Sequence, residues 1–361
     1  MSFNFFLLRG LRLFLFPFSV IIGLYITLRN FFYDKGWLRA ASFNLPIICI
    51  GNLSVGGTGK SPMTEYLLRL LSASYQTAVL SRGYKRKTVG YLLANDNTSA
   101  LEIGDEPMQF HKKFPNVSVA VGEERTEAIP QLLHDRPDTG VIILDDAFQH
   151  RSIRAGLNII LTDYSNPYWH DMYLPTGDLR DNKRSANRAD IIIVTKCPAL
   201  MDVRQKQEYL GHINPLPGQA VFFTTIDYGT PYHITNKEIL PLEKLMEVLL
   251  VCGIANPLPL KQYLEANVAV YFERNYNDHH IFSIDDWKEI VEKFNLLDGE
   301  QKIILTTEKD AVRLEKFGSL LDKVPVYVLP IRHRFLFDEG PHFDGLLVKF
   351  IDNFPLKSAR E

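Results

Sequence analysis

The residues most able to do chemistry lie in a glycine-rich stretch, residues 54–61, which reads SVGGTGKS. Glycines in such a loop let backbone N–H groups curl around phosphate oxygens, a lysine reaches the β- and γ-phosphates, and a Ser or Thr hydroxyl ligates magnesium. The usual pattern begins with a glycine where this chain has Ser54, so a glycine turn with a chance lysine is the plainer alternative. The stretch predicts a nucleotide-binding phosphate loop made of Ser54, Val55, Gly56, Gly57, Thr58, Gly59, Lys60 and Ser61, with Lys60 also counted as catalytic.

Two consecutive aspartates close a short apolar run at residues 141–144. Magnesium beside a phosphate loop takes a carboxylate from the end of a neighbouring strand. Either aspartate alone can instead cap a helix. Together with the loop they predict a metal site, with Asp146 in the magnesium shell and Asp145 beside it. Ser61 and Glu106 are the further candidate metal ligands.

Two segments offer a base for phosphoryl transfer to an alcohol, which needs one near the hydroxyl. GDEPM carries Asp105 and Glu106 on a loop or at a helix start, where a simple cap is the alternative. NDHH carries Asp278 and His279 after a strand-like run, where a structural role is the alternative. These residues are the candidates for the acceptor side of the site.

Two arginines are candidates for holding phosphate, Arg125 in VGEERTEA and Arg180 in LPTGDLRD. A surface arginine is usually only solvated. On loops that a doubly wound sheet aims at its ligand crevice, either side chain can instead hold a phosphate through two parallel hydrogen bonds.

The segment VTKCP tests for a guanine nucleotide. Guanine reading uses an aspartate two residues after the lysine of such a strand-end motif. Here Lys196 is followed by Cys197 and Pro198, so the segment lends no support to GTP.

The apolar pattern supplies a scaffold for these residues. Residues 45–53 read as a buried strand and residues 63–74 as the helix that follows the loop. Further apolar runs occupy residues 76–83, 117–122, 141–148, 157–165 and 189–196. Most are β-branched and free of charge, as strands covered on both faces are, and helical stretches separate some of them. The first lobe is therefore predicted to be an α/β, doubly wound parallel sheet like that of the P-loop NTPases.

A second series of strands and helices follows a stretch of short alternating strands and turns at residues 220–245. This series predicts a second, smaller α/β lobe. The predicted domains are an N-terminal membrane-associated helix in residues 1–40, a P-loop domain in residues 41–215, and a smaller C-terminal α/β domain with its connecting strands in residues 216–361.

Length, charge and cysteine usage agree with this division. A chain of 361 residues exceeds the usual span of one core and favours two domains. The formal net charge of -2 argues against a general nucleic-acid binder. Cys49, Cys197 and Cys252 lie far apart in apolar stretches, which indicates neither disulfides nor a zinc site and fits a reducing cytosol.

The N-terminal segment carries no charge from residue 13 to residue 28. A helix of that length covers roughly 24 Å, which is short of the ~30 Å hydrocarbon core. Its flanks hold Arg9, Arg12, Arg29, Lys35 and Arg39 against Asp34. A signal peptide and a buried core helix are the alternatives. The favoured interpretation is a membrane-associated helix, shallowly inserted or marginally spanning, with basic residues on anionic headgroups.

Nine ordered segments closely resemble the tetraacyldisaccharide 4'-kinases of lipid A biosynthesis: IGNLSVGGTGKSP, LSRGYKRK, GDEPMQF, VGEERTEA, VIILDDAFQH, LPTGDLRD, VCGIANP, NDHH and TTEKDAVRL. The likeness runs from about residue 45 to residue 314. On this comparison Ser54 is no departure, because the family's loop has the form GN-x-x-x-GGTGK. Ser61 stands where Thr is usual and preserves the hydroxyl.

The resemblance implies a lipid kinase that moves the ATP γ-phosphoryl group to the 4'-hydroxyl of a tetraacylated glucosamine disaccharide 1-phosphate. It implies two α/β lobes with the site between them, and ATP and Mg²⁺ as cofactors. Transferred by motif, Lys60 and Ser61 bind nucleotide and magnesium, Asp145 and Asp146 act at the metal, Arg125 and Arg180 contact phosphates, and Asp105 is the base, assisted by His279 with Asp278 nearby. The expected partners are the lipid substrate and the cytoplasmic face of the bacterial inner membrane, with no nucleic acid and no evident obligate protein partner.

Two rival functions stay open at this stage. One is another phosphate-loop enzyme, such as an ATP-dependent ligase or a membrane-associated partition ATPase, although a partition-type loop would have a further lysine where Ser54 and Val55 stand. The other is a membrane-tethered nucleotide switch that binds without transferring.

Overall fold

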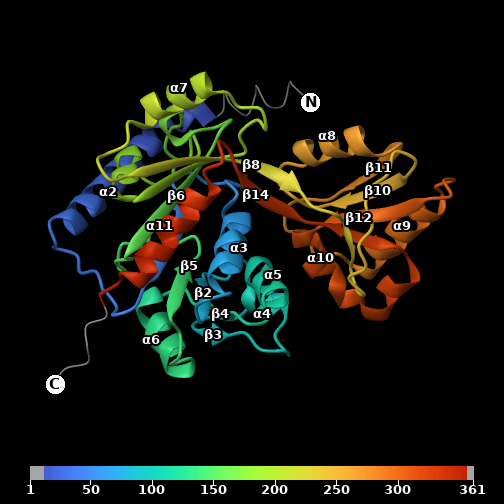
Figure 1. Ribbon diagram of the computed structural model, residues 1–361, viewed down its shortest axis with the longest axis horizontal. Helices are drawn as coiled ribbons and strands as arrows, with labels where there is room; N and C mark the ends of the chain where they lie inside the picture. The colour runs from blue at the N-terminus through green and yellow to red at the C-terminus, as the bar shows by residue number, and fades with distance from the viewer. Residues whose placement is uncertain (1–11, 356–361) are drawn as a thin grey trace.

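The computed structural model describes residues 12–355 and contains two β-sheets that lie in separate lobes (Figure 1). Residues 1–11, including Arg9 of the predicted basic flank, lie outside the described residues, as do residues 356–361.

The first lobe is built on a nine-stranded sheet of order β14-β8-β7-β6-β1-β5-β2-β4-β3. Neighbouring strands are parallel except for the β3–β4 and β8–β14 pairs. Its strands are β1 (Ile47–Asn52), β2 (Thr77–Ser81), β3 (Leu92–Leu93), β4 (Ser118–Val121), β5 (Val141–Leu144), β6 (Leu157–Asp163), β7 (Ile191–Thr195), β8 (Ala220–Tyr228) and β14 (Ile331–Phe335). This order places β1, and the loop after it, in the middle of the sheet.

Helices cover both faces of this sheet. Alternate residues of β1 enter different cores, Ile47 and Cys49 on one face and Ile48 and Ile50 on the other. The helices of this lobe are α3 (Lys60–Leu71), α4 (Ala100–Ile103), α5 (Asp105–Lys113), α6 (Arg125–Asp135), α7 (Val203–Ile213) and α11 (Gly340–Asp352), with 3-10 turns η1 (Tyr168–His170) and η2 (Lys183–Arg188). Apolar side chains of α6 fill the first core, whereas those of α3, α5 and α11 fill the second. The predicted doubly wound architecture is confirmed.

The second lobe has a five-stranded sheet of order β11-β10-β12-β13-β9. Its strands are β9 (Tyr232–His233), β10 (Glu247–Cys252), β11 (Val270–Asn275), β12 (Lys302–Thr307) and β13 (Val326–Leu329), and only β9 runs antiparallel to its neighbour. Its helices are α8 (Leu258–Asn267), α9 (Ile284–Asn295) and α10 (Glu308–Leu314), followed by the 3-10 segment η3 (Glu315–Lys323). Separate cores lie on its two faces, so this lobe too has α/β/α layers.

The chain crosses between the lobes twice, after β8 and before β14. The crossings are adjacent, because the Gly229 N–H donates to the Pro330 carbonyl oxygen at 2.9 Å. Division into folding units stays a prediction, but the sheets divide the chain differently from the predicted ranges 41–215 and 216–361. Strands β8 and β14 and helix α11 belong to the first lobe, because antiparallel pairing lets the returning chain extend the first sheet.

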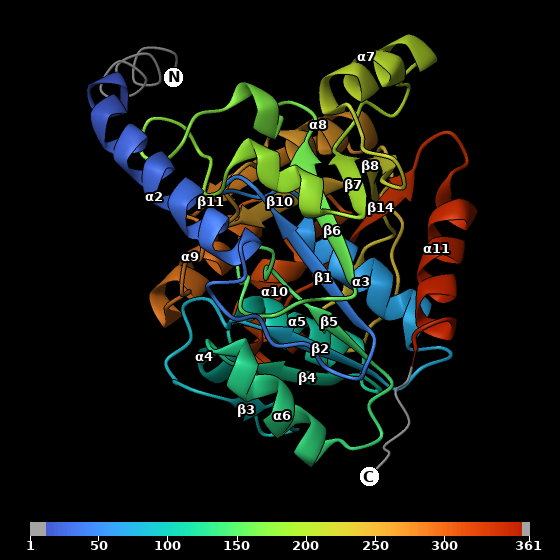
Figure 2. The same cartoon turned by 90° about the vertical axis from the view of Figure 1, so that its left-hand side faces the viewer.

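The N-terminal helix α2 (Phe16–Asp34) lies along the side of the first lobe that faces away from the second, as Figure 2 shows. Its small and polar residues face the protein: Ser19 donates to the Thr176 hydroxyl at 2.8 Å, and Asn30 donates to Asp181 at 2.8 Å. Its large apolar residues face outward, and Ile21, Leu24 and Tyr25 are each more than 60% exposed. Within residues 12–355, α2 is the helix long and apolar enough to cross a membrane by length and composition.

Candidate active site

The phosphate loop, residues 54–61, connects β1 to α3 as predicted. Gly59 is the N-cap of α3 and has φ 84°, a left-handed conformation that favours glycine. The loop is fixed from the protein side. The Thr195 hydroxyl donates to the Thr58 carbonyl oxygen at 2.9 Å, and the Asn52 amide donates to the Thr58 hydroxyl at 2.9 Å. The structure therefore presents a shaped loop at the carboxyl edge of the sheet, where open α/β sheets bind ligands.

Positive and negative side chains meet directly beside this loop. The Lys60 ammonium lies 3.8 Å from an Asp146 carboxylate oxygen. Arg180 donates to both oxygens of Asp146 and to the Asn52 side-chain oxygen. Burial alone would raise the pKa of Asp146, but Lys60 and Arg180 outweigh it and lower the pKa. Asp146 has φ 48°, so the chain turns sharply where β5 ends and aims this carboxylate at the loop.

Asp145 lies behind Asp146 and is buried. It accepts hydrogen bonds from the Thr64 and Ser81 hydroxyls, each at 3.1 Å. Burial, followed by the negative charges of Glu106 and Asp146, raises the pKa of Asp145 well above its ordinary value. Carboxylates gathered in this way are the environment that a cation stabilises.

The remaining predicted metal ligands touch each other: the Ser61 hydroxyl donates to the Glu106 carboxylate at 2.8 Å. The four candidates are all hard oxygen donors, the kind that Mg²⁺ prefers. Among residues 12–355, no group of three or more His, Cys, Asp or Glu is close enough to hold a metal. The donor set therefore fits a Mg²⁺ ion that takes part of its shell from nucleotide phosphates and water.

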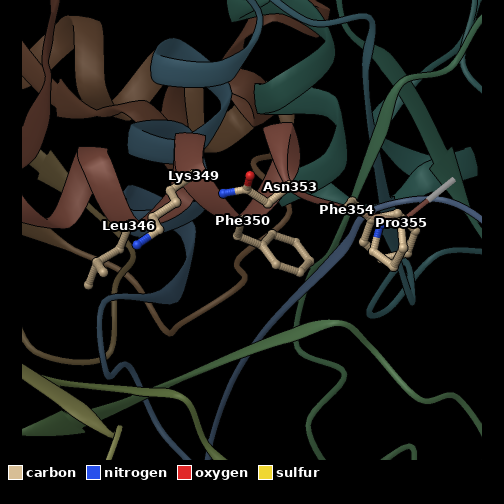
Figure 3. A pocket seen from close by; sticks show the side chains of 6 residues that line it. All are labelled: Leu346, Lys349, Phe350, Asn353, Phe354 and Pro355. Carbon is tan, nitrogen blue, oxygen red and sulfur yellow. The ribbon is translucent and has the colours of Figure 1, made fainter.

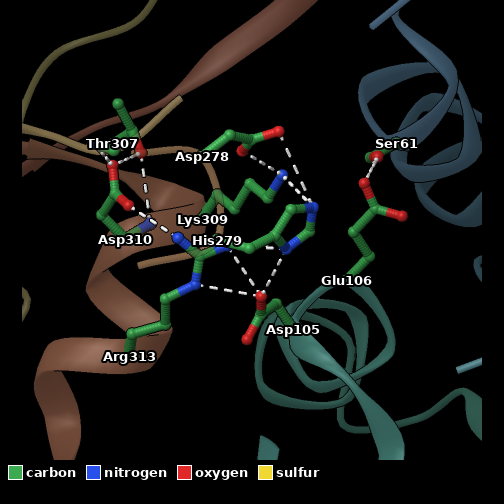
Figure 4. A network of polar contacts seen from close by, with 10 residues as sticks. Ser61, Asp105, Glu106, Asp278, His279, Thr307, Lys309, Asp310 and Arg313 are labelled. Atoms are coloured by element: carbon green, nitrogen blue, oxygen red, sulfur yellow. Dashed lines mark hydrogen bonds and ion pairs between the residues drawn. The ribbon is translucent and has the colours of Figure 1, made fainter. Parts of the chain in front are cut away.

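The predicted acceptor residues Asp105 and His279 meet, although they come from different lobes (Figure 4). His279 Nδ1 lies 3.1 Å from Asp105 Oδ2. Arg313 on α10 donates to the same oxygen from Nε at 2.9 Å and from Nη2 at 2.7 Å. Burial alone would raise the pKa of Asp105, but the hydrogen bonds from His279 and Arg313 outweigh it and lower the pKa to about 2. Asp105 is therefore a carboxylate at neutral pH, held by three donors.

The other nitrogen of His279 faces Lys309, whose ammonium lies 3.1 Å from Nε2. An ammonium can only donate, so Nε2 accepts from Lys309. Nδ1 faces two groups at 3.1 Å, the Asp105 carboxylate oxygen and Arg313 Nη2. Lys309 also donates to Asp278 at 3.1 Å, so the third residue predicted for the acceptor side lies in the same network. The imidazole is thus held in one orientation between the two lobes by contacts on both ring nitrogens.

Helix α5 links the two halves of the site. Its first residue, Asp105, contacts the second lobe, and its second residue, Glu106, contacts Ser61 of the phosphate loop. The start of a helix carries a partial positive charge, which favours both carboxylates there. The nucleotide side and the acceptor side therefore lie at one helix end.

Arg125 differs from its expected placement on an open loop. It is the first residue of α6 and is 1% exposed, and its Nη1 donates to the Gly122 and Glu123 carbonyl oxygens. Its Nε and Nη2 have no partner in the described part of the chain. Tertiary packing covers this arginine, which the local sequence does not reveal, and its contact with phosphate stays a prediction.

Three residues of the site were not among the predicted ones: Asn52, Lys309 and Arg313. Each lies inside a segment that carries the family resemblance, Asn52 in IGNLSVGGTGKSP and the other two in TTEKDAVRL. Arg313 is held from behind by Asp310, which accepts from its Nη1 at 3.0 Å and from the Gly253 N–H at 2.9 Å. The motif TTEKDAVRL contained Lys309 and Arg313. Residue spacing alone does not distinguish a basic side chain that enters a site from one that is solvated.

A surface hollow of about 390 Å³ lies elsewhere, at the end of α11 (Figure 3). Its lining residues are Leu346, Lys349, Phe350, Asn353, Phe354 and Pro355. None of the predicted site residues borders it, so the convergent chemistry belongs to the region between the lobes.

The comparisons with known proteins agree with this geometry. Residues 11–351 match the family model described as LpxK, tetraacyldisaccharide-1-P 4'-kinase. A protein of Flavobacterium johnsoniae with the name tetraacyldisaccharide 4'-kinase is 45% identical over 344 residues, covering 94% of this chain and 97% of that protein. One of Bacteroides thetaiotaomicron with the same name is 44% identical over 351 residues, covering 93% of this chain and 92% of that protein. The crystal structure of LpxK from Aquifex aeolicus in complex with ATP has a TM-score of 0.74 and 28% identity, and the match covers 94% of this chain and 99% of that one.

Proposed function

Because the chain belongs to the tetraacyldisaccharide-1-P 4'-kinase family, we propose that it transfers the ATP γ-phosphoryl group to the 4'-hydroxyl of a tetraacyldisaccharide 1-phosphate. The observation that carries the proposal is the meeting of a phosphate loop with an interlobe carboxylate–imidazole pair at the start of α5. One half of this arrangement suits a nucleotide and the other suits an alcohol, as a kinase requires.

On the nucleotide side, the loop amides and Lys60 bind the β- and γ-phosphates. Lys60 and Arg180 both approach Asp146 in this structure, so both cations stand where negative charge gathers. Cations in this position stabilise the charge that spreads over the transferred group in the transition state. Arg125, although buried, adds positive charge near Asp145.

Magnesium is the metal that we propose for the oxygen donors Ser61, Asp145 and Asp146, with Glu106 as a further candidate. When bound, Mg²⁺ would neutralise part of the negative charge on the phosphates. Asp146 would exchange its contacts with Lys60 and Arg180 for the metal.

On the acceptor side, Asp105 accepts the proton of the sugar hydroxyl, and His279 orients the Asp105 carboxylate. With a pKa of about 2, Asp105 is a weak base, so its first effect is to hold the hydroxyl oxygen in line with the γ-phosphorus. In a loose transition state the hydroxyl keeps its proton until the new O–P bond is nearly formed, so a strong base is not needed earlier. Asp278 acts one step further away, through Lys309.

The outer face of α2 is the surface that we propose lies against the membrane. A 19-residue helix spans about 28 Å, and its apolar side chains point away from the protein while its small and polar ones point inward. An apolar surface of this kind marks contact with a membrane or with another apolar partner. Use of ATP, together with buried free thiols, favours the cytoplasmic face of the inner membrane.

Thin-layer analysis of radiolabelled ATP incubated with lipid fractions tests the transfer. We expect label from the γ-position in a lipid that requires the disaccharide 1-phosphate acceptor. Label found only in inorganic phosphate would contradict transfer and favour a ligase or a nucleotide switch. The Asp105→Ala variant is the matched control, because it should bind ATP and label lipid about 10²–10⁴-fold more slowly.

Sedimentation with vesicles that contain anionic lipids tests the membrane surface. Deletion of residues 1–33 should leave both lobes folded, since β1 begins at Ile47, and should reduce the fraction that sediments. High salt should weaken only the headgroup part of binding, because exposed charges are screened within about 10 Å at 0.1 M. A truncated protein that still sediments fully at high salt would contradict the assignment.

A further inference from the structure

His333 on β14 is a buried histidine that contacts the phosphate loop from behind. Its Nε2 lies 2.9 Å from the Gly59 carbonyl oxygen, and its Nδ1 lies 2.9 Å from the Thr224 hydroxyl on β8. The two contacting residues Gly59 and His333 are 274 positions apart in the sequence. His333 is not among the residues proposed above to bind the nucleotide, the metal or the acceptor.

The partners of His333 settle its tautomer. A carbonyl oxygen only accepts, so Nε2 carries the hydrogen, and Nδ1 then accepts from the Thr224 hydroxyl. Burial lowers the pKa of His333 to about 4, so the ring is neutral at physiological pH. A neutral imidazole with one donor and one acceptor satisfies both contacts without adding charge beside the phosphates.

The hydrogen bond to Gly59 fixes the direction of a neighbouring N–H group. The Gly59 carbonyl and the Lys60 N–H belong to the same planar trans peptide and point in opposite directions. The Gly59 carbonyl oxygen also accepts from the Met63 N–H of α3 at 3.2 Å, so His333 supplies a second hydrogen bond that holds this carbonyl toward the protein. The Lys60 N–H is then turned outward, where a phosphate oxygen would lie. The Thr195 hydroxyl does the same for the preceding peptide by holding the Thr58 carbonyl oxygen.

The ring also fills the space beneath the loop. A Cβ atom at Gly59 would lie 3.0 Å from both Cε1 and Nε2 of His333, and Gly59 has a positive φ. The left-handed glycine and the imidazole therefore fit each other. The two strands in this contact flank the crossings between the lobes: the chain leaves the first lobe after β8 and returns to it at β14.

We propose that His333 is a positioning residue for ATP binding, which holds the Gly59–Lys60 peptide with its N–H group turned toward the phosphates. The inference rests on the proposed function only in taking residues 54–61 as a nucleotide phosphate loop. It also ties the shape of that loop to the two strands that connect the lobes.

Three substitutions at this position separate positioning from packing. In His333→Gln the amide nitrogen lies as many bonds from Cβ as Nε2 does, so it can donate to Gly59. In His333→Asn the amide reaches only as far as Nδ1, and His333→Ala removes both contacts. Phe335→Leu is the matched control, because Phe335 is buried on the same strand and packs against Tyr66 and Phe343.

The measurements are the Kd for ATP by calorimetry, KM for ATP, kcat, and the unfolding midpoint of each full-length variant. The Gly59 carbonyl oxygen keeps its hydrogen bond from the Met63 N–H in every variant, so the substitutions remove one of its two hydrogen bonds. We therefore expect Ala and Asn to weaken ATP binding by about 5- to 10-fold, whereas Gln stays within about twofold of wild type. Phe335→Leu should lower the unfolding midpoint and leave the Kd for ATP unchanged.

Equal ATP affinities for the Asn and Gln variants would overturn the inference, even if His333→Ala fails to fold. So would an affinity loss in His333→Ala no larger than that of the Phe335→Leu control. Both results leave the proposed function standing while wild type binds and uses ATP. A wild-type protein that does not bind ATP would instead overturn the phosphate-loop assignment itself.

Discussion

Replacing Arg313 by Met should change the pH dependence of the reaction. The Asp105 pKa lies at about 2, against an ordinary value of 3.8, and that difference corresponds to roughly 2 kcal/mol in favour of the carboxylate. Arg313 supplies two of the three hydrogen bonds to Asp105 Oδ2. Methionine keeps the apolar stem and removes both donors and the charge, while the burial that opposes ionisation remains. The Asp105 pKa should therefore rise above its wild-type value.

The assay is kcat/KM for the lipid acceptor between pH 5 and pH 9. Wild type should show no acidic loss from Asp105, because a group with a pKa of about 2 is ionised throughout this range. Arg313→Met should lose about 10²-fold at neutral pH, since the carboxylate is no longer held in place, and lose further activity as the pH falls. Arg313→Lys is the control, because it keeps the charge but not the pair of donors, and it should lie between the two.

Stability provides a second check on the same ion pair. A lowered pKa means that Asp105 adds stability fully above about pH 4, and that this contribution disappears as the pH falls through about 2. Arg313→Met should lose that contribution at neutral pH and unfold at a lower urea concentration. A variant with wild-type kcat/KM and an unchanged pH profile would refute the view that Arg313 sets the protonation of Asp105.

Four other single substitutions and one double variant test the rest of the site. Lys60→Ala should lower kcat by about 10³-fold or more, because the cation over the β- and γ-phosphates is lost, and activity within tenfold of wild type would argue against the phosphate loop. Asp146→Asn should respond to raised Mg²⁺ or to Mn²⁺ differently from wild type in a metal titration of kcat, and an identical response would remove its metal role. Asp105→Ala and His279→Ala should each lower turnover by about 10²–10⁴-fold with nearly normal ATP affinity, and the double variant should be little worse than the poorer single one, whereas multiplicative losses would show independent action.

The fold and the nucleotide side could be predicted because their signals are local. Charge-free, β-branched runs such as residues 141–144 indicate strands covered on both faces, and the glycines and Lys60 lie within a few residues of each other. The predicted C-terminal range 216–361 includes strand β14, because residues 331–335 have no signal of the sheet they join. Pairing with β8, which is more than 100 residues earlier, decides that.

The acceptor side depends on contacts that spacing cannot show. Asp105 and His279 are 174 positions apart, and only the ordered resemblance to a family brought them together before the structure did. Arg313 and Arg125 show the converse. Arg313 binds Asp105 in the site but was not among the predicted residues. Arg125 was among them and is buried. Tertiary packing decides the surroundings of an arginine, and the local sequence does not show it.

The low pKa of Asp105 bears on how such a site can work. A general base is most effective when its pKa lies near the working pH, and the donors around Asp105 hold it far below. The same donors fix Asp105 at the start of α5, one residue from the side chain that touches the phosphate loop. If the new bond to phosphorus forms late, the acidity of the hydroxyl rises as the bond forms, and a weak but well-placed base then suffices. The interlobe ion pair between Arg313 and Asp105 therefore makes Asp105 a weaker base but fixes its position. Loss of the ion pair should reduce turnover, because the lost positioning outweighs the gain in basicity.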